Sequence, residues 1–411
     1  MLDNKGDMWI ICVVRENGIQ VVRRKKMKEQ LGLYVHIPFC ERKCKYCDFL
    51  SGPSSVQNKK AYIDALKKEI EQCKGYDEKY EVVSIFFGGG TPSSIDAEDL
   101  AAVLDKLCEV FKIEDCDRIE ITTEANPGTL TKEKLEVYKK GGFNRLSLGL
   151  QSTHNEELKM LGRIHTYEEF LENYKMAKEA GFTNINIDLM SALPNQTKEG
   201  YRQTLERVLA LKPSHISAYS LIIEEGTPFY EVYGEDKELE HTLPDEETDR
   251  EMYHMTKQLL KEAGYDRYEI SNYALDGKEC IHNKLYWTGK AYLGFGVGAS
   301  SYIEGVRYRN EEDLSEYMNY INKKKDIKRD VTKLSQNEKM EEFMFLGLRL
   351  IQGVSKQAFE TQFGVSVEEV YKDVLKKHEQ EGLLINGKER IYLTEPGLDV
   401  SSYVMSDFLL E

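Results

Sequence analysis

Apolar runs alternate with amphipathic segments from Gly32 to about Leu221. The apolar runs predict six short β-strands, at Leu31–Ile37, Val82–Phe87, Arg118–Thr123, Arg145–Gly149, Asn184–Leu189 and His215–Ser220. The amphipathic segments predict helices between them, at Lys59–Gln72, Ala97–Phe111, Thr131–Lys140, Tyr167–Ala180 and Lys198–Leu211. This alternation predicts a parallel sheet with crossover helices, either as a partial (β/α)6 barrel or as a doubly wound sheet. In both folds ligands bind where the strands end.

The pattern changes after Ser220. A turn is predicted at Glu224–Pro228 and a capped helix from Pro244 to Ala263. The last segment predicts three helices and a small hairpin, at Gln336–Leu350, Ser355–Phe363, Val367–Glu381, Leu383–Ile385 and Ile391–Leu393. We therefore predict an α/β protein with a C-terminal, mainly helical, winged-helix-like domain. The expected division is an N-terminal extension at 1–30, a barrel at 31–240, a barrel extension at 241–331 and the C-terminal domain at 332–411.

DNA binding is one function of winged-helix-like modules, but the charge of this one does not favour it. Between Lys356 and Glu395 there are six Lys or Arg against eight Asp or Glu, so the segment has no basic recognition face. The whole chain carries a net charge of −15, which argues against an extended nucleic-acid footprint. We expect the domain to cap the barrel or to contact a protein, and we expect no nucleic-acid partner.

Composition is that of an ordinary soluble globular protein, with 41% hydrophobic and 31% charged residues. No apolar run approaches the ~18 residues needed to span a bilayer. The apolar run Trp9–Val14 precedes a basic run, the wrong order for a secretory signal. We therefore expect a cytoplasmic protein. Residues 1–26 are expected to be a disordered extension, or an artefact of start-site assignment with Met27 as the initiator.

Eight cysteines in such a chain indicate metal or redox use and not a disulfide framework. Three of them form a CxxxCxxC motif in the loop that leaves the first predicted strand: Cys40, Cys44 and Cys47. A structural zinc site needs four N or S ligands, usually in two close pairs, and no second pair follows. A cubane cluster normally takes four cysteines, so three leave one iron free to bind another ligand. The other cysteines are expected to be small buried apolar residues: Cys12, Cys73, Cys108, Cys116 and Cys280.

The stretch Tyr34-x-His-Ile-Pro-Phe-Cys40-x-x-x-Cys44-x-x-Cys47 resembles the signature of the radical S-adenosylmethionine (SAM) enzymes. The branch is the one that contains oxygen-independent coproporphyrinogen III oxidase and its heme-chaperone relatives. The resemblance runs from about Gly32 to the C-terminus and implies a partial (β/α)6 radical SAM barrel. It also implies a [4Fe-4S] cluster whose unique iron is chelated by SAM. An electron donor then reduces the cluster, and SAM is cleaved to methionine and a 5′-deoxyadenosyl radical.

The same resemblance implies SAM-binding residues where successive strands end. A glycine run follows the second strand, where bare backbone can approach a ligand and offer its amides. Polar residues near the later strands supply carboxylates for the ammonium and hydroxyls of SAM and a guanidinium for its carboxylate. Taken singly, each is more often a loop residue or an ion-pair partner. By resemblance we expect SAM contacts from Tyr34, Tyr46, Gly89, Gly90, Thr91, Glu124, Gln151, Arg163 and Asp188.

The segment His282-Asn-x-x-Tyr286-Trp287 resembles the HNxxYW motif of the heme-chaperone branch, the HemW type. An imidazole can ligate heme iron, and neighbouring aromatic rings can cover a porphyrin face. We therefore name His282 as a heme ligand. A single histidine beside Tyr and Trp is, however, usually a hydrogen-bonded structural residue, and His36 is another candidate ligand.

Two functions follow from the resemblance, and a radical SAM enzyme that acts on an unrelated substrate is a third possibility that nothing in the sequence demands. The first is a heme chaperone that holds heme and passes it to apo-hemoproteins such as respiratory enzymes. The second is oxidative decarboxylation of coproporphyrinogen III. The oxidases usually carry a further cysteine two positions after the third, and here that position is Phe49. With the HNxxYW motif, this departure favours the chaperone. A homodimer and a peripheral membrane contact are both compatible with the sequence.

Overall fold

The computed structural model describes residues 28–410. Its main feature is a curved sheet in which the first six strands are parallel neighbours in chain order. These strands are β1 Glu29–Ile37, β2 Tyr80–Gly89, β3 Glu120–Ala125, β4 Arg145–Gln151, β5 Asn184–Ser191 and β6 His215–Ser220. The sheet does not close on itself, because the two strands at its edges do not pair with each other. The partial barrel is therefore confirmed, since a doubly wound sheet would reverse its strand order.

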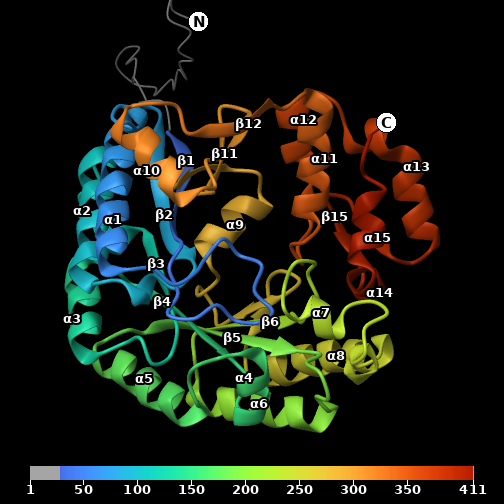
Figure 1. The fold of residues 1–411 in the computed structure, drawn as a ribbon. Helices are drawn as coiled ribbons and strands as arrows, with labels where there is room; N and C mark the ends of the chain where they lie inside the picture. The colour runs from blue at the N-terminus through green and yellow to red at the C-terminus, as the bar shows by residue number, and fades with distance from the viewer. Residues whose placement is uncertain (1–27, 411) are drawn as a thin grey trace, which may run out of the picture.

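Helices between these strands cover the outer face of the sheet (Figure 1). They are α1 Val56–Glu71, α2 Ala97–Phe111, α3 Lys132–Gly141, α4 Asn155–Leu161, α5 Tyr167–Glu179 and α6 Lys198–Leu211. The predicted helices all form, and α4 is an additional short one. Thr131, Thr166 and Thr197 each accept a hydrogen bond from a first-turn amide, which fixes where α3, α5 and α6 begin. The helices bury apolar stripes against the strands, and together they form the main core.

The N-terminal prediction needs one change. Strand β1 begins at Glu29, so the last two residues of the expected extension at 1–30 belong to the sheet. The strand starts there because Glu29 is already in register with Tyr80 of β2. The expected disorder of the segment before it, and Met27 as the start, lie outside the described residues.

Six further strands extend both edges of the sheet and were not predicted. Antiparallel β8 and β7 follow β6, while β9 lies parallel to β1 and continues into β10, β11 and β12. Their bounds are β7 Asp266–Arg267, β8 Asn272–Ala274, β9 Ala291–Phe295, β10 Ser300–Ile303, β11 Val306–Asn310 and β12 Lys328–Lys333. The helices of this region are α7 Tyr230–Tyr233, α8 Glu246–Glu262, α9 Ile281–Trp287 and α10 Leu314–Asn322.

The C-terminal domain is mainly helical with a small three-stranded sheet, which confirms the winged-helix-like prediction. Its elements are α11 Gln336–Gly347, β13 Val354–Ser355, α12 Lys356–Phe363, α13 Val367–Gln380, β14 Leu384–Asn386, β15 Arg390–Leu393, α14 Glu395–Asp399 and α15 Ser401–Ser406. It lies on the open side of the barrel (Figure 1). Arg307 of β11 pairs with Glu342 at 2.5 Å, and Arg267 of β7 pairs with Glu395 at 2.9 Å. The domain therefore joins the two ends of the sheet.

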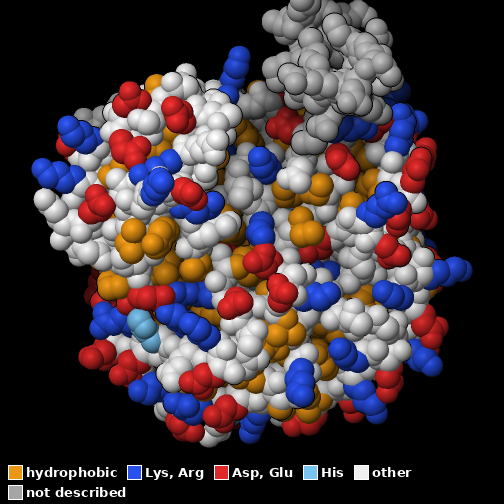
Figure 2. Space-filling view, turned by 180° about the vertical axis from the view of Figure 1, so that it is seen from behind, with side chains coloured by type: hydrophobic (Ala, Val, Ile, Leu, Met, Phe, Trp, Pro, Cys, Tyr) orange, Lys and Arg blue, Asp and Glu red, His pale blue; other side chains and the backbone are white. Residues whose placement is uncertain are grey.

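Acidic and basic side chains are interspersed on the face opposite to that of Figure 1, as Figure 2 shows. The net charge of −15 is therefore not gathered there in one acidic patch. Within residues 28–410, no helix combines the length and the apolar character that crossing a membrane requires.

Candidate cluster and nucleotide site

The three cysteines of the motif lie on a loop that leaves β1 and closes on itself. The amide of Cys40 donates to Gly52 O, and the amide of Gly52 donates to Pro38 O, both at 3.0 Å. The side chain of His36 reaches across to Leu50 O, 2.9 Å from Nε2. The loop also bonds to a neighbouring segment, because Lys45 N donates to Leu161 O at 3.0 Å. The backbone that carries the thiols is thus fixed by main-chain hydrogen bonds.

Two of the three sulfurs receive hydrogen-bond donors from outside the loop. Thr91 Oγ1 donates to Cys40 Sγ at 3.4 Å, and Arg163 Nη1 donates to Cys44 Sγ at 3.5 Å. Donors aimed at sulfur suit thiolate ligands of a metal centre. Among residues 28–410, no three His, Cys, Asp or Glu side chains converge closely enough to hold a single ion. Three cysteines are one ligand short of the four that a structural zinc site needs, whereas a cubane cluster held by three cysteines keeps one iron open for another ligand.

A cavity of about 420 Å³ opens beside the cysteine loop, within the usual size range of small-molecule sites. It lies where the parallel strands end, as expected for this class of fold. Its lining includes all three cysteines and eight of the nine residues expected to contact SAM: Tyr46, Gly89, Gly90, Thr91, Glu124, Gln151, Arg163 and Asp188. Tyr34 is absent from the lining. Its hydroxyl lies 3.1 Å from His36 Nδ1. Contact of these residues with SAM stays a prediction.

Glu124 and Asp188 form a half-buried acidic pair in the lining of this cavity. The pKa of Glu124 is raised to about 8. Loss of solvation is the larger cause, and the charge of Asp188 is the second. Burial also raises the pKa of Asp188, against hydrogen bonds from Asn186 and Ser147 that lower it. Two carboxyls held together in this way favour a cationic ligand, because a positive charge relieves both burial and mutual repulsion.

The glycine run does not offer free amides, so that part of the prediction is wrong. Gly90 N and Thr91 N donate to the carbonyls of Ile37 and Phe39 at 2.9 and 2.8 Å, and Gly89 N donates to Glu124. The glycines are needed for close packing, since a Cβ at Gly90 would lie 2.8 Å from two backbone oxygens. The run therefore holds the cysteine loop against β2.

Gln151 has the strained backbone that often marks a functional site. It ends β4 with φ at +72°, in the left-handed region that non-glycine residues rarely adopt. A bulge in the pairing of β4 with β5 lies at the same place. Both features turn the end of the strand into the cavity lining.

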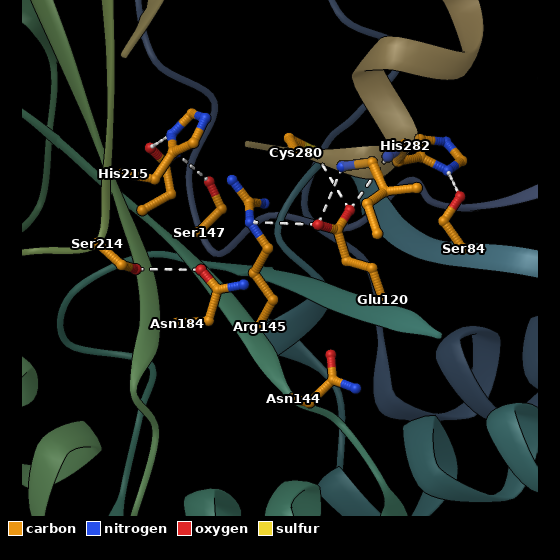
Figure 3. A network of polar contacts seen from close by, with 12 residues as sticks. Ser84, Glu120, Asn144, Arg145, Ser147, Asn184, Ser214, His215, Cys280 and His282 are labelled. Carbon is orange, nitrogen blue, oxygen red and sulfur yellow. Dashed lines mark hydrogen bonds and ion pairs between the residues drawn. The ribbon is translucent and has the colours of Figure 1, made fainter. Parts of the chain in front are cut away.

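His282 and the rest of its motif lie at the opposite end of the barrel. Helix α9 is capped by the buried Glu120, whose carboxylate accepts the amides of Ile281 and His282, each at 3.1 Å (Figure 3). Glu120 begins β3 and Glu124 stands four residues further along it, which separates the two sites by ~13 Å at ~3.3 Å per residue. The fold therefore does not bring His282 to the cysteines.

Each ring nitrogen of His282 has a hydrogen-bond partner. Ser84 Oγ lies 2.9 Å from Nδ1, and Tyr286 OH lies 2.9 Å from Nε2. Burial, with a smaller contribution from Arg145, lowers the pKa of His282 to about 3, so the ring is neutral. Trp287, the last residue of the motif, packs against Arg349 of the C-terminal domain at 4.3 Å. This geometry matches the structural alternative, and the heme-ligand role stays a prediction.

His36, the other candidate ligand, has both ring nitrogens within hydrogen-bond distance of Tyr34 OH and Leu50 O. Burial lowers its pKa. Iron could reach either histidine only after one of these hydrogen bonds had broken.

Comparison with known proteins adds the family. Residues 34–208 match the radical SAM superfamily model, and residues 334–400 match the HemN C-terminal domain model. The heme chaperone HemW of Bacillus subtilis (strain 168) is 38% identical over 92% of this chain and 99% of its own. HemW of Escherichia coli (strain K12) is 32% identical over 93% of this chain and 98% of its own. This chain belongs to the HemW family of radical SAM proteins. Membership of the radical SAM superfamily implies a [4Fe-4S] cluster and SAM as its cofactors.

Among solved structures, the coproporphyrinogen III oxidase HemN from Escherichia coli matches with a TM-score of 0.81. The match covers 93% of this chain and 90% of HemN at 24% sequence identity, so it supports the fold alone. The barrel and its C-terminal domain therefore share one architecture with HemN.

Several lining residues of the cavity were not singled out in the sequence. Asn126 comes two positions after Glu124, in Thr-Glu-Ala-Asn-Pro, where its place just beyond a strand was an available signal. Met190, Tyr219 and Ile222 reach the cavity from β5 and the end of β6. They belong to apolar runs that a sequence pattern assigns to the core.

Proposed function

We propose that this protein is a cytoplasmic heme chaperone that holds heme and transfers it to apo-hemoproteins, respiratory enzymes among them. The full-length similarity to proteins named heme chaperone HemW supports the proposal. A homodimer and a peripheral contact with the membrane of its clients complete it. The position of the heme site is inferred from the side chains at the mouth of the cavity.

Exposed apolar side chains lie at the mouth of the cavity, beside the exposed charged residues Arg42, Asp48 and Glu224. Phe49, Tyr219 and Ile222, which we call the apolar rim, line the cavity and stay 63%, 40% and 69% exposed. Large apolar side chains gathered at an opening mark a binding surface. A flat, apolar porphyrin can cover such side chains and remove them from water. Phe49 is also the position where the oxidases usually carry a further cysteine.

Cationic side chains adjoin the apolar rim. The exposed Arg42 lines the cavity, and Lys43 Nζ donates to Phe49 O at 3.0 Å. Heme carries two propionates, which pair with cations at the edge of a site. An apolar face with cations beside it therefore matches the chemistry of heme, and the position needs no contribution from His282.

The chain's own residues prepare the SAM site below this rim. When bound and reduced by a donor, the cluster supplies one electron to the sulfonium of SAM. Thr91 and Arg163 orient the cysteine sulfurs, while Glu124 and Asp188 offer carboxyls for the ammonium and ribose hydroxyls. Heme on the rim would close the cavity and exclude water from it.

Substitution of the apolar rim weakens heme binding. We expect Phe49→Asp and Ile222→Asp each to reduce heme affinity about tenfold or more, because each removes an apolar contact worth about 1.5–3 kcal/mol. The measurement is a heme titration followed by absorption, with iron content of the protein checked first. Val331→Asp is the matched control, since Val331 is 59% exposed on β12 and does not line the cavity. Equal affinities in all variants would place heme elsewhere.

An activity assay on the wild-type protein distinguishes the chaperone from the oxidase. With SAM and a reductant, we expect no conversion of coproporphyrinogen III. Robust formation of protoporphyrinogen would move the protein to the oxidase class, whatever its heme affinity.

Replacement of His282 tests its two roles directly. From its hydrogen bonds we expect His282→Ala to lower the melting temperature and to leave heme affinity unchanged. Ser84→Ala and Tyr286→Phe are the matched variants, because each frees one ring nitrogen and keeps the imidazole. If only His282→Ala loses heme while all three variants lose stability, His282 is a heme ligand as well as a structural residue, and the expectation of unchanged heme affinity is wrong.

A further inference from the structure

Asn126 lies at the centre of the polar contacts that reach the cysteine sulfurs. It directly follows β3, and its side chain bridges two loops. Asn126 Nδ2 donates to Thr91 Oγ1 at 2.7 Å, and Asn126 Oδ1 accepts from Arg163 Nη2 at 2.7 Å. The residues on either side of this amide are the two that donate to sulfur.

The direction of these hydrogen bonds is fixed by chemistry. A guanidinium only donates, so the atom of Asn126 that faces Arg163 must be the oxygen. The nitrogen of the amide then faces Thr91 and donates to its hydroxyl oxygen. The hydroxyl proton of Thr91 is left to point at its remaining neighbour, Cys40 Sγ, 3.4 Å away. One amide thus determines where the Thr91 proton goes.

Arg163 is held in the same manner. Its Nη2 is shared between Asn126 Oδ1 and the carbonyl of Gly149, which leaves Nη1 directed at Cys44 Sγ, 3.5 Å away. The backbone of Asn126 is itself fixed, because its amide donates to Ser93 Oγ at 3.3 Å. Donors to two of the three cysteines therefore share one hydrogen-bond partner, the side-chain amide of Asn126.

We propose that Asn126 is a positioning residue that aims Thr91 and Arg163 at the cluster sulfurs and so sets the reduction potential of the cluster. A hydrogen bond to a thiolate sulfur stabilises the reduced cluster more than the oxidised one, because the reduced state carries more negative charge. The bonds from Thr91 and Arg163 raise the potential, and loss of their alignment lowers it. The inference goes beyond heme transfer and rests on the cluster assignment.

The test is a potentiometric titration of the anaerobically reconstituted full-length protein, followed by electron paramagnetic resonance without SAM. We expect a more negative midpoint potential in Thr91→Val and a return towards the wild-type value in Thr91→Ser. Asn126→Ala should shift the potential further than Thr91→Val, because it releases both donors. The double variant Thr91→Val/Asn126→Ala should have the same midpoint potential as Asn126→Ala alone, since the two residues act through one network.

Thr122→Val is the matched control, because it makes the same isosteric change at a buried hydroxyl that has no hydrogen-bond partner among residues 28–410. It should keep the wild-type potential. Wild-type potentials in both Thr91→Val and Asn126→Ala, with iron content unchanged, would overturn the proposal, as would shifts that simply add in the double variant. If Asn126→Ala fails to load iron, the midpoint potentials of Thr91→Val and Thr91→Ser decide the outcome. A lower potential in Thr91→Val that returns in Thr91→Ser supports the proposal, and equal potentials overturn it. Absence of cluster from the wild type would instead overturn the cofactor assignment.

Discussion

Replacing Cys40, Cys44 or Cys47 by alanine is expected to abolish the iron–sulfur absorption of protein reconstituted without oxygen. Each thiol is predicted to be one of three protein ligands, and the remaining two would not hold a cubane. Thr91 and Arg163 would then face a methyl group in place of a sulfur, which adds no compensating ligand. The measurement is the visible absorption spectrum together with iron and sulfide content per chain.

Cys73→Ala is the matched control for this series. Cys73 is a half-buried free thiol that packs against the main core just beyond α1 and does not line the cavity. Its removal should leave the absorption unchanged. An unaltered spectrum in all three motif variants, or zinc in the wild-type protein, would show that these cysteines do not hold an iron–sulfur cluster.

Glu124→Gln is expected to weaken SAM binding strongly and to remove its dependence on pH. In the free protein the pKa of Glu124 is about 8, so the carboxyl is largely protonated at pH 7. An ammonium or sulfonium group favours the carboxylate, so binding releases the proton below pH 8. Affinity for SAM should therefore rise with pH, approaching tenfold per unit, and level off above about pH 8. Calorimetric titrations between pH 6.5 and 9 of wild type and variant test this.

The same substitution should stabilise the protein without SAM. The folded protein holds the Glu124 proton from about pH 4.5, the ordinary pKa, to about pH 8, so its stability falls as pH rises through this interval. The ionised carboxylate therefore carries a cost in stability above pH 8, because desolvation and the charge of Asp188 both oppose the charged form. The Glu124→Gln variant avoids that cost, and its melting temperature should exceed that of wild type at pH 8.5.

Glu69→Gln separates stability from binding. Burial also raises the pKa of Glu69 to about 7, yet Glu69 bonds to Gly296, Asn310 and Tyr317 and does not line the cavity. It should change the pH dependence of unfolding and leave SAM affinity as it is. If Glu69→Gln weakened SAM binding as much as Glu124→Gln, the carboxylate contact with SAM would be refuted.

Local pattern was enough for the first half of the fold. The six buried strands and their helices alternate so regularly that their order follows from the chain, as Val82–Phe87 and Ala97–Phe111 illustrate. The edge strands from β7 to β12 were missed because they are short or partly exposed, and because β9 pairs with β1 from ~260 residues away in the chain. The pairing of two such distant segments cannot be recognised from the hydrophobic pattern of either strand alone.

The position of the HNxxYW segment could not be obtained from its letters. Its imidazole and aromatic rings are compatible with a heme site, but Glu120 of β3 binds the amides at the start of α9 and draws the helix into the base of the barrel. There Ser84 and Tyr286 occupy the ring nitrogens of His282. Only tertiary contacts decide whether a histidine is available, because availability depends on neighbours from other strands.

By itself the sequence determined the cysteine loop, the parallel barrel and eleven of the twenty-four residues that line the cavity. Ligand spacing, hydrophobic period and strand ends are local properties, so they can be obtained from the order of residues. The tertiary structure alone decided that the amides of the glycine run are already bonded, that Asn126 joins Thr91 to Arg163, and that the apolar rim surrounds the mouth. These features depend on atoms from different loops meeting in space, and such meetings are set by packing of the whole chain.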